Sequence, residues 1–326
     1  FGGSYLNHQY LICACALQHD NAPEAMRVKL DADGRLTKKP DSPSANVAAV
    51  QVISSGGGQV TPEGWSVNTS QPAYQPSGVR PADGGSPDLA DPKGRAGFGE
   101  PVPAQTMRTI GDTLSAKGVS WAWYSGGWSL ALADGRQPAS VARKVIYTRD
   151  EGSPNFQPHH QPFNYHLRYA PGTTERAQHL KDGDDLLRDV AAGTLPSVSF
   201  YKPAGRYTQH PSYTDVKSGD DHMADLLDKL RASPQWKNML IVLTYDENGG
   251  YWDHVPPPSG AGWGDRLGPG TRIPALIIGP QVKRGFVDHT SYDTGSILKL
   301  ITRRFGLEPL PSVRAQPGDL SGALTP

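Results

Sequence analysis

Apolar positions along the chain follow two patterns, which predict alternating strands and helices. Short runs rich in β-branched and aromatic residues predict strands at 50–53, 119–124, 198–201, 239–244 and 273–278. Longer segments with apolar residues on one side predict helices at 5–16, 109–117, 182–192, 222–232 and 293–304. Because strand and helix alternate repeatedly, we expect an α/β fold with a mainly parallel sheet covered by helices on both faces.

Residues at the helix ends support these boundaries. We expect Ser4 to be the N-cap of the first helix and Asp221 the N-cap of the helix at 222–232. Gly193 follows the helix at 182–192 directly, where a glycine ends helices readily.

One long segment interrupts this alternation. From Ser54 to Val102 the composition changes to glycine, proline, serine, asparagine and aspartate. Such a composition predicts a surface insertion with little regular structure, and not a second core.

Composition and charge exclude several classes of function. Lysine plus arginine and aspartate plus glutamate number 32 each, so we expect no electrostatic binding of nucleic acid or of an anionic membrane. No apolar run is long enough for a transmembrane helix. The two cysteines, Cys13 and Cys15, are predicted not to bridge each other across a helix. They are then either small buried residues, or one of them pairs with a segment outside this sequence.

Two adjacent acids suggest a metal site. Asp246 and Glu247 follow the apolar run 239–243 and precede Gly249 and Gly250, which allow a tight turn. Ligands of open α/β sheets bind at the carboxyl ends of the strands, and paired carboxylates there are typical ligands of a metal ion. The alternative is an ordinary acidic turn after an edge strand.

The start of the first predicted helix is a candidate anion site. Ser4 lies where a hydroxyl nucleophile would meet free backbone N–H groups and the positive end of the helix. Asn7 is on the same side of the first turn and is placed to donate to a phosphate oxygen. The alternative is that Ser4 is only a cap and that Asn7 and His8 are ordinary helix residues.

Several histidines are further candidates. His159 and His160 are adjacent in a proline-flanked loop, and His222 follows two aspartates at a predicted helix start. Histidines donate to phosphate oxygens and give protons to leaving alkoxides. The alternative for the pair is two surface histidines, and His254 and His289 are weaker candidates. The chain lacks a P-loop, a dinucleotide-binding glycine motif and Gly-x-Ser-x-Gly, so nucleotide-binding enzymes and α/β-hydrolase esterases are unsupported.

Five motifs, taken in order, resemble the phosphoesterase family. This family includes bacterial phospholipases C and the related bacterial acid phosphatases, within the alkaline phosphatase superfamily, and the resemblance covers nearly the whole chain except 54–102. The motifs are Phe1-Gly2-Gly3-Ser4-Tyr5-Leu6-Asn7-His8-Gln9, Pro158-His159-His160, His210 to His222, Tyr245 to Pro258 and Val287 to Thr294.

The resemblance implies a fold and a role for each matching residue. It implies a three-layer, alkaline phosphatase-like sandwich and a periplasmic or secreted location. A serine in the first motif resembles the acid phosphatase branch, since the phospholipase C branch has threonine there. The implied roles are nucleophile for Ser4, metal ligands for Asp246 and Glu247, and phosphate-pocket residues for Asn7, His159, His160 and His222, with one histidine protonating the leaving group.

The chain departs from the family pattern in its N-terminal motifs. In the family, an N-terminal motif resembling Met-Glu-Asn-Arg-Ser-Phe-Asp supplies a Glu-Asn pair that binds metal, and a pocket histidine precedes the serine. Neither this motif nor that histidine is found here. We therefore expect residues 1–326 to be the C-terminal portion of one phosphoesterase domain. A missing N-terminal segment, retained as a separate chain or lost, would complete the metal site.

These observations lead to one functional hypothesis and two alternatives. We expect an acid phosphatase that hydrolyses phosphomonoesters through a phosphoserine, with one divalent metal ion (Ca, Mg, Mn, Fe or Zn). The first alternative is a phospholipase C or another phosphodiesterase. The second is an inactive, processed binding or surface protein that retains the fold.

Overall fold

A three-stranded parallel sheet is the centre of the molecule. The computed structural model describes residues 3–28, 58–94, 98–211, 213–258, 267 and 269–325. The strand order is β4 (Leu180–Asp182), β3 (Trp121–Ser125), β5 (Val198–Lys202). Ser125 pairs with both Asp182 and Lys202, so the three strands end at the same level.

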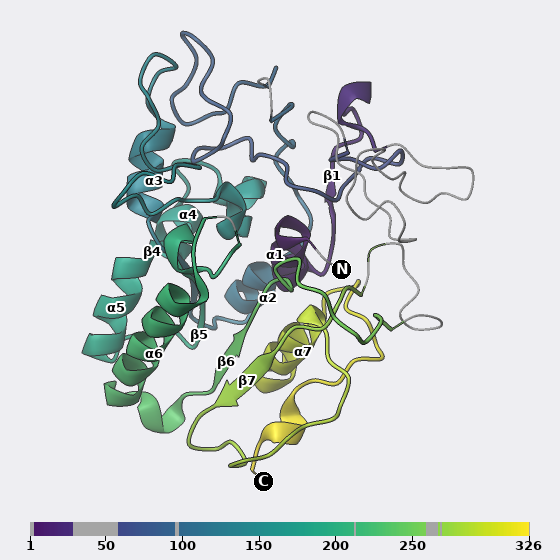
Figure 1. The fold of residues 1–326 in the computed structure, drawn as a ribbon, viewed down its shortest axis with the longest axis vertical. Helices are drawn as coiled ribbons and strands as arrows, with labels where there is room; N and C mark the ends of the chain where they lie inside the picture. The colour runs from purple at the N-terminus through teal and green to yellow at the C-terminus, as the bar shows by residue number, and fades with distance from the viewer. Residues whose placement is uncertain are drawn as a thin grey trace.

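Helices pack on both faces of the three-stranded sheet (Figure 1), and every residue of β3 is buried although successive side chains point to opposite faces. Trp121 and Trp123 face a core shared with α1 (Ser4–Cys13), α2 (Ile110–Ala116) and α7 (Thr294–Phe305). Ala122 and Tyr124 face α5 (Gly183–Ala192) and α6 (Val216–Ala232). The α/β class is confirmed, whereas the three-layer sandwich stays a prediction.

The remaining elements are short. They are β1 (Leu17–Gln18), β2 (Trp65–Ser66), α3 (Trp128–Gly135), α4 (Thr174–His179), and the 3-10 helices Glu24–Met26, Pro158–His160, Pro162–Tyr165, Leu167–Tyr169, Gly205–Tyr207, Trp236–Asn238 and Ser321–Ala323. None of the described helices has the length and apolar character needed to cross a bilayer.

Two predicted strands pair in an unexpected way. β6 (Ile241–Thr244) and β7 (Ala275–Ile278) form a separate, antiparallel two-stranded sheet (Figure 1). The prediction that they belong to a buried parallel sheet was wrong, and Leu276 is 57% exposed. A parallel pair needs a crossover connection, usually a helix. The described residues between β6 and β7 contain no helix, and the chain returns antiparallel.

Three predicted helices have the expected cores and ends. α2 begins after a Thr109 capping box, α5 begins after Asp182 and ends at Gly193, and α7 begins after Asp293. In α7, Leu298 and Ile301 are buried, in agreement with a helix whose apolar residues lie on one side.

Two predicted N-caps were wrong. Gly3 is the N-cap of α1, so Ser4 is already the first helical residue and its hydroxyl points elsewhere. α6 begins at Val216, because Asp215 caps it by accepting a hydrogen bond from the Ser218 N–H. Asp221 therefore lies inside α6, six residues after Asp215.

The two cysteines form a disulfide, contrary to the prediction. Their Cα atoms are 5.1 Å apart. The prediction assumed that both lie in the helix, but α1 ends at Cys13 and Ala14 adopts a left-handed conformation with φ 51°. This turn brings Cys15 out of the helix and back to Cys13.

The insertion predicted at 54–102 is described over 58–94 and 98–102. Its one regular element in these ranges is β2, which pairs with β1. Buried polar side chains such as Ser66, Ser70 and Gln75 hold it by hydrogen bonds. The strand predicted at 50–53 lies outside the described residues.

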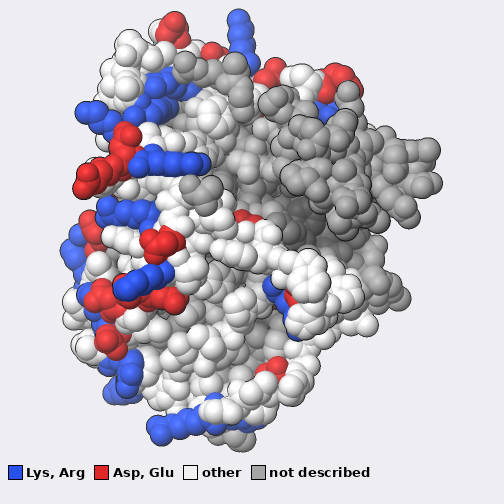
Figure 2. Space-filling view, in the orientation of Figure 1, with Lys and Arg blue, Asp and Glu red and all other residues white. Residues whose placement is uncertain are grey.

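Charges of both signs alternate on the face formed by α5 and α6 (Figure 2). Ion pairs one turn apart account for much of this pattern: Arg188 with Asp185, Lys217 with Asp221, and Lys229 with Asp225. Such exposed pairs contribute little to stability, about 0–1 kcal/mol each.

Candidate functional site

Three residues distant in sequence meet at the start of α1. The Ser4 Oγ lies 3.2 Å from the His159 Nε2 and also donates a hydrogen bond to the Asp246 Oδ2. Asp246 follows β6 by two residues, and His159 belongs to the 3-10 helix Pro158–His160. The structure thus brings together the predicted nucleophile, one predicted histidine and one predicted metal ligand.

The first turn of α1 contributes two further side chains to this cluster. Residues three and four apart share one face of a helix, so Asn7 and His8 lie beside Ser4. The Asn7 side-chain amide donates to the backbone oxygen of Asp246. The His8 Nδ1 is 2.8 Å from the Ser4 carbonyl oxygen and 3.6 Å from the Asp246 Oδ2.

Asp246 is a charged group surrounded by donors. The Lys202 Nζ lies 3.0 Å from the Asp246 Oδ1. Burial opposes ionisation, but the charge of Lys202, together with the neighbouring His8 and the hydrogen bond from Ser4, holds the pKa of Asp246 well below its usual range. The carboxylate therefore remains ionised at physiological pH.

Three histidine rings pack against one another beneath Ser4. The His8 ring stacks on His160 at 5.3 Å and meets His159 edge-on at 5.6 Å. The backbone oxygen of His160 accepts hydrogen bonds from the Trp123 indole at 2.8 Å and the Ser125 hydroxyl at 2.9 Å. These bonds fix the histidine pair to the carboxyl end of β3. The alternative of two surface histidines is wrong, because both are buried.

Burial keeps these histidines neutral. It lowers the pKa of His8 to about 4 and the pKa of His159 and His160 well below 6.5. The His159 Nδ1 is buried and has no hydrogen-bond partner among the described residues, while its Nε2 faces Ser4. A neutral imidazole in this position is suited to accept the Ser4 proton.

His222 lies elsewhere. Its Nε2 is 2.7 Å from the Tyr201 hydroxyl, and its ring stacks on Tyr207 at 4.5 Å. It is inside α6, not at a helix start as predicted, and burial lowers its pKa. Its contacts in the described part of the chain do not include Ser4 or Asp246.

Glu247 is next to the Ser4 cluster. Its carboxylate lies 3.9 Å from the His210 Nε2, and burial together with the Asp246 charge raises the pKa of Glu247. The Ser4 hydroxyl and the Asp246 and Glu247 carboxylates are hard oxygen donors, the ligand type that Ca²⁺, Mg²⁺ and Mn²⁺ prefer. Within the described ranges, no three His, Cys, Asp or Glu side chains come together as a metal-binding group. The set is therefore a partial one.

The two weaker candidates remain apart from this cluster. The His254 side chain is 73% exposed and lies 3.9 Å from Asp253, which Arg272 holds through two bonds of 2.8 and 2.9 Å. His289 is exposed. Neither has a contact with Ser4 in the described part of the chain.

Sequence reasoning gave no role to Lys202 or His8. Lys202 directly follows a predicted strand, so the carboxyl-end argument that selected Asp246 would have selected it as well. His8 was noted as an ordinary helix residue, although its spacing of four from Ser4 placed it on the same face.

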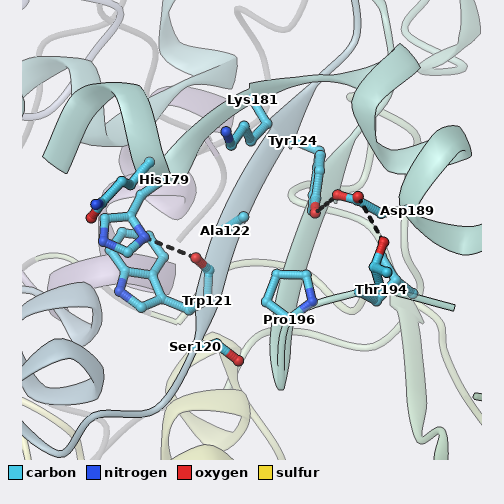
Figure 3. A pocket seen from close by; sticks show the side chains of 11 residues that line it. Ser120, Trp121, Ala122, Tyr124, His179, Lys181, Asp189, Thr194 and Pro196 are labelled. Carbon is cyan, nitrogen blue, oxygen red and sulfur yellow. Dashed lines mark hydrogen bonds between the residues drawn. The ribbon is translucent and has the colours of Figure 1, made fainter. Parts of the chain in front are cut away.

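An open cavity lies toward the opposite end of the sheet (Figure 3). It includes Ser120 and Pro196, which precede β3 and β5. The Tyr124 hydroxyl donates to Asp189 at 2.6 Å, and the Thr194 hydroxyl donates to the other oxygen at 3.1 Å. Because these polar groups satisfy one another, the Ser4 cluster is the stronger candidate site.

Comparison with known proteins gives consistent matches. A model of the phosphoesterase family matches residues 1–308. A non-hemolytic phospholipase C of Pseudomonas aeruginosa is 31% identical over 171 residues, covering 43% of this chain and 25% of the relative. Phospholipase C B of Mycobacterium tuberculosis is 34% identical over 152 residues, covering 40% of this chain and 29% of the relative. Non-specific phospholipase C6 of Arabidopsis thaliana is 33% identical over 151 residues, covering 37% of this chain and 28% of the relative. The alignments thus span less than a third of each of these relatives.

Proposed function

Because the chain belongs to the phosphoesterase family, we propose that it hydrolyses phosphoric esters at the Ser4 cluster. One observation carries this proposal: the Ser4 Oγ lies between the His159 Nε2 and the Asp246 Oδ2. A hydroxyl within reach of a buried, neutral imidazole is the arrangement of an activated nucleophile.

The proposed reaction has two steps. For attack, the Ser4 hydroxyl turns its proton from the Asp246 Oδ2 to the His159 Nε2. The proton passes to that nitrogen as the Oγ forms a bond to phosphorus, and the bond from phosphorus to the ester oxygen breaks. The alkoxide departs on the side of phosphorus opposite Ser4 and takes its proton from a second acid of the pocket, which the resemblance implies is a histidine, and the proton on His159 returns to the Ser4 Oγ in the second step. Water then hydrolyses the phosphoserine. The first backbone N–H groups of α1 and its dipole favour the phosphoryl anion beside Ser4.

We also propose one divalent cation, held by Asp246 and Glu247. It would neutralise charge on the phosphoryl oxygens when bound. Ca²⁺ takes about 6–8 oxygen ligands, so the remaining ligands would come from substrate, from water or from a further polypeptide segment such as the resemblance implies. The proposal predicts that a longer polypeptide of this family's length binds the cation more tightly than residues 1–326, by calorimetry.

Two classes of substrate have support. Ser4, as the serine of the acid phosphatase-like motif, supports phosphomonoesters. The names of the relatives support phospholipids as the second candidate. We place the phosphomonoesters first because Ser4 is a property of this chain.

Turnover by the Ser4→Ala variant tests the function. We expect p-nitrophenyl phosphate hydrolysis at acid pH, in a panel of divalent cations, to fall at least about 1,000-fold in S4A, because the nucleophile is lost. Ser120→Ala is the matched control, since Ser120 is exposed and lies at the opposite end of β3. Near-normal turnover by S4A would contradict the mechanism. Faster turnover of phosphatidylcholine or a bis-ester would favour the second candidate. If no ester is turned over, even by the longer polypeptide, the result would favour a binding protein.

The fold and location form part of the same proposal. Packing on both faces of β3 supports the three-layer, alkaline phosphatase-like architecture. The Cys13–Cys15 disulfide supports the periplasmic or secreted location, because disulfides persist in oxidising compartments. Thiol titration of the protein isolated from periplasm and from cytoplasm tests the location.

A further inference from the structure

We propose that Lys202 is a positioning residue that holds the Asp246 carboxylate in the orientation that Ser4 requires, and that it competes with a divalent cation for that carboxylate. The inference rests on the proposed function. No motif included Lys202, and its role follows only from where β5 ends.

The geometry divides the two oxygens of Asp246 between two partners. The Lys202 Nζ is 3.0 Å from the Oδ1, and the Ser4 hydroxyl donates to the Oδ2. The Lys202 side chain is 14% exposed. Its backbone is fixed by pairing with Ser125 at the end of β3. The ammonium group thus approaches the carboxylate from a rigid element, which is how a precise site is supported.

Lys202 also connects two separate parts of the fold. Asp246 follows the β6–β7 sheet, and Lys202 ends β5 of the three-stranded sheet. The described strands form no backbone ladder between these sheets, so side-chain contacts fix Asp246 relative to Ser4. Without the ammonium, the carboxylate could rotate, and the Oδ2 would no longer be held in position to accept the hydrogen bond from Ser4.

The same charge has a second effect. Like charges repel strongly at short range where little water separates them. An ammonium at the Oδ1 therefore weakens the binding of a cation to the same carboxylate. A cation that does bind would occupy the Oδ2 side, which is nearer Ser4. Removal of the ammonium should tighten cation binding. A lysine that served only to stabilise the local structure would give the opposite sign, because its loss would loosen the ligands.

The experiment compares Lys202→Met and Lys202→Arg with wild type. Lys181→Met is the control, because Lys181 is on the strand β4 next to β3 and lines the cavity of Figure 3, whose lining includes neither Ser4 nor Asp246. Two quantities are measured: kcat and KM for p-nitrophenyl phosphate, and the Kd for Mn²⁺ by calorimetry. Circular dichroism confirms the fold of each variant, and Lys202→Gln replaces K202M if that variant does not fold.

We expect K202M to lose at least about 10-fold in kcat with KM changed less than about 3-fold, because orientation and not binding is lost. K202R should recover most of the kcat, because it keeps the charge. The Kd for Mn²⁺ should fall about 10-fold in K202M, and K181M should match wild type in both quantities.

Other results would overturn the inference. Unchanged kcat in K202M, in an active wild type, refutes the positioning role and leaves the proposed function intact. An unchanged or weaker Mn²⁺ affinity in K202M, or no Mn²⁺ binding by either protein, refutes the competition. If the wild type itself shows no turnover, the proposed function fails, and the Mn²⁺ titration still decides whether Lys202 opposes cation binding.

Discussion

Replacing His8 with glutamine should remove one contribution to the sensitivity of this protein to acid. The His8 ring is 3% exposed, and burial lowers its pKa to about 4 from the ordinary 6.5. Between these two values the unfolded chain binds a proton at His8 that the folded chain does not bind. The free energy of unfolding therefore falls as the pH falls through this window.

The size of the effect follows from the shift. At 1.36 kcal/mol per pKa unit, a lowering of about 2.5 units corresponds to about 3 kcal/mol, most of it lost by about pH 4.5. His8→Gln is similar in size and does not titrate. Near neutral pH, H8Q is expected to be less stable than wild type through lost packing. Between neutral pH and about pH 4.5, the free energy of unfolding of H8Q should rise relative to that of wild type by about 2–3 kcal/mol.

Urea unfolding of both proteins with a chelator present, at several pH values between about 7 and 4.5, measures this difference. His159 and His160 are present in both proteins but contact His8 at 5.6 and 5.3 Å, so the measured difference includes the effect of His8 on their titration. Leu11→Ala is the control: it removes packing from the same helix without changing a titrating group, so its difference from wild type should stay constant. A constant difference between wild type and H8Q would refute the reasoning, since His8 would then titrate alike in folded and unfolded chains.

Three further variants test the packing described above. Trp123→Ala should cost about 3–5 kcal/mol in urea unfolding, because the indole is buried and its N–H donates into the histidine pair. Gly126→Ala should cost about 1–3 kcal/mol in the same assay, because the new Cβ would lie 2.3 Å from the Ala204 nitrogen. Cys15→Ser should cost no more than about 2 kcal/mol, because the loop closed with Cys13 is so short, and a loss above about 4 kcal/mol would contradict this.

Local sequence signals predicted most of the elements that pack around β3. Helices α2, α5 and α7 and strands β3 and β5 lie within a few residues of the predicted positions, because caps and periodicity are local properties. The start of α6 was placed too late, since Asp215 and Asp221 are equally good caps and only the structure shows which one accepts the helix N–H.

Pairing between distant segments was much less predictable. The apolar runs that form β6 and β7 suit a parallel or an antiparallel pair equally well, and no local signal chooses between them. The same limit applies to the site. The residue types at Ser4, His159 and Asp246 suggested chemistry, but the contact of Lys202 with Asp246 depends on two strands of different sheets.

The division of the site between two sheets makes it sensitive to partial unfolding. Ser4 and Asp246 are 242 residues apart in sequence, and Asp246 extends from the small β6–β7 sheet. That sheet has two short strands and partly exposed side chains, which are features of a region that opens at low free energy. Opening of this sheet alone would separate the carboxylate from the hydroxyl while the core around β3 remained folded. Loss of activity on heating would then precede the loss of helical circular dichroism.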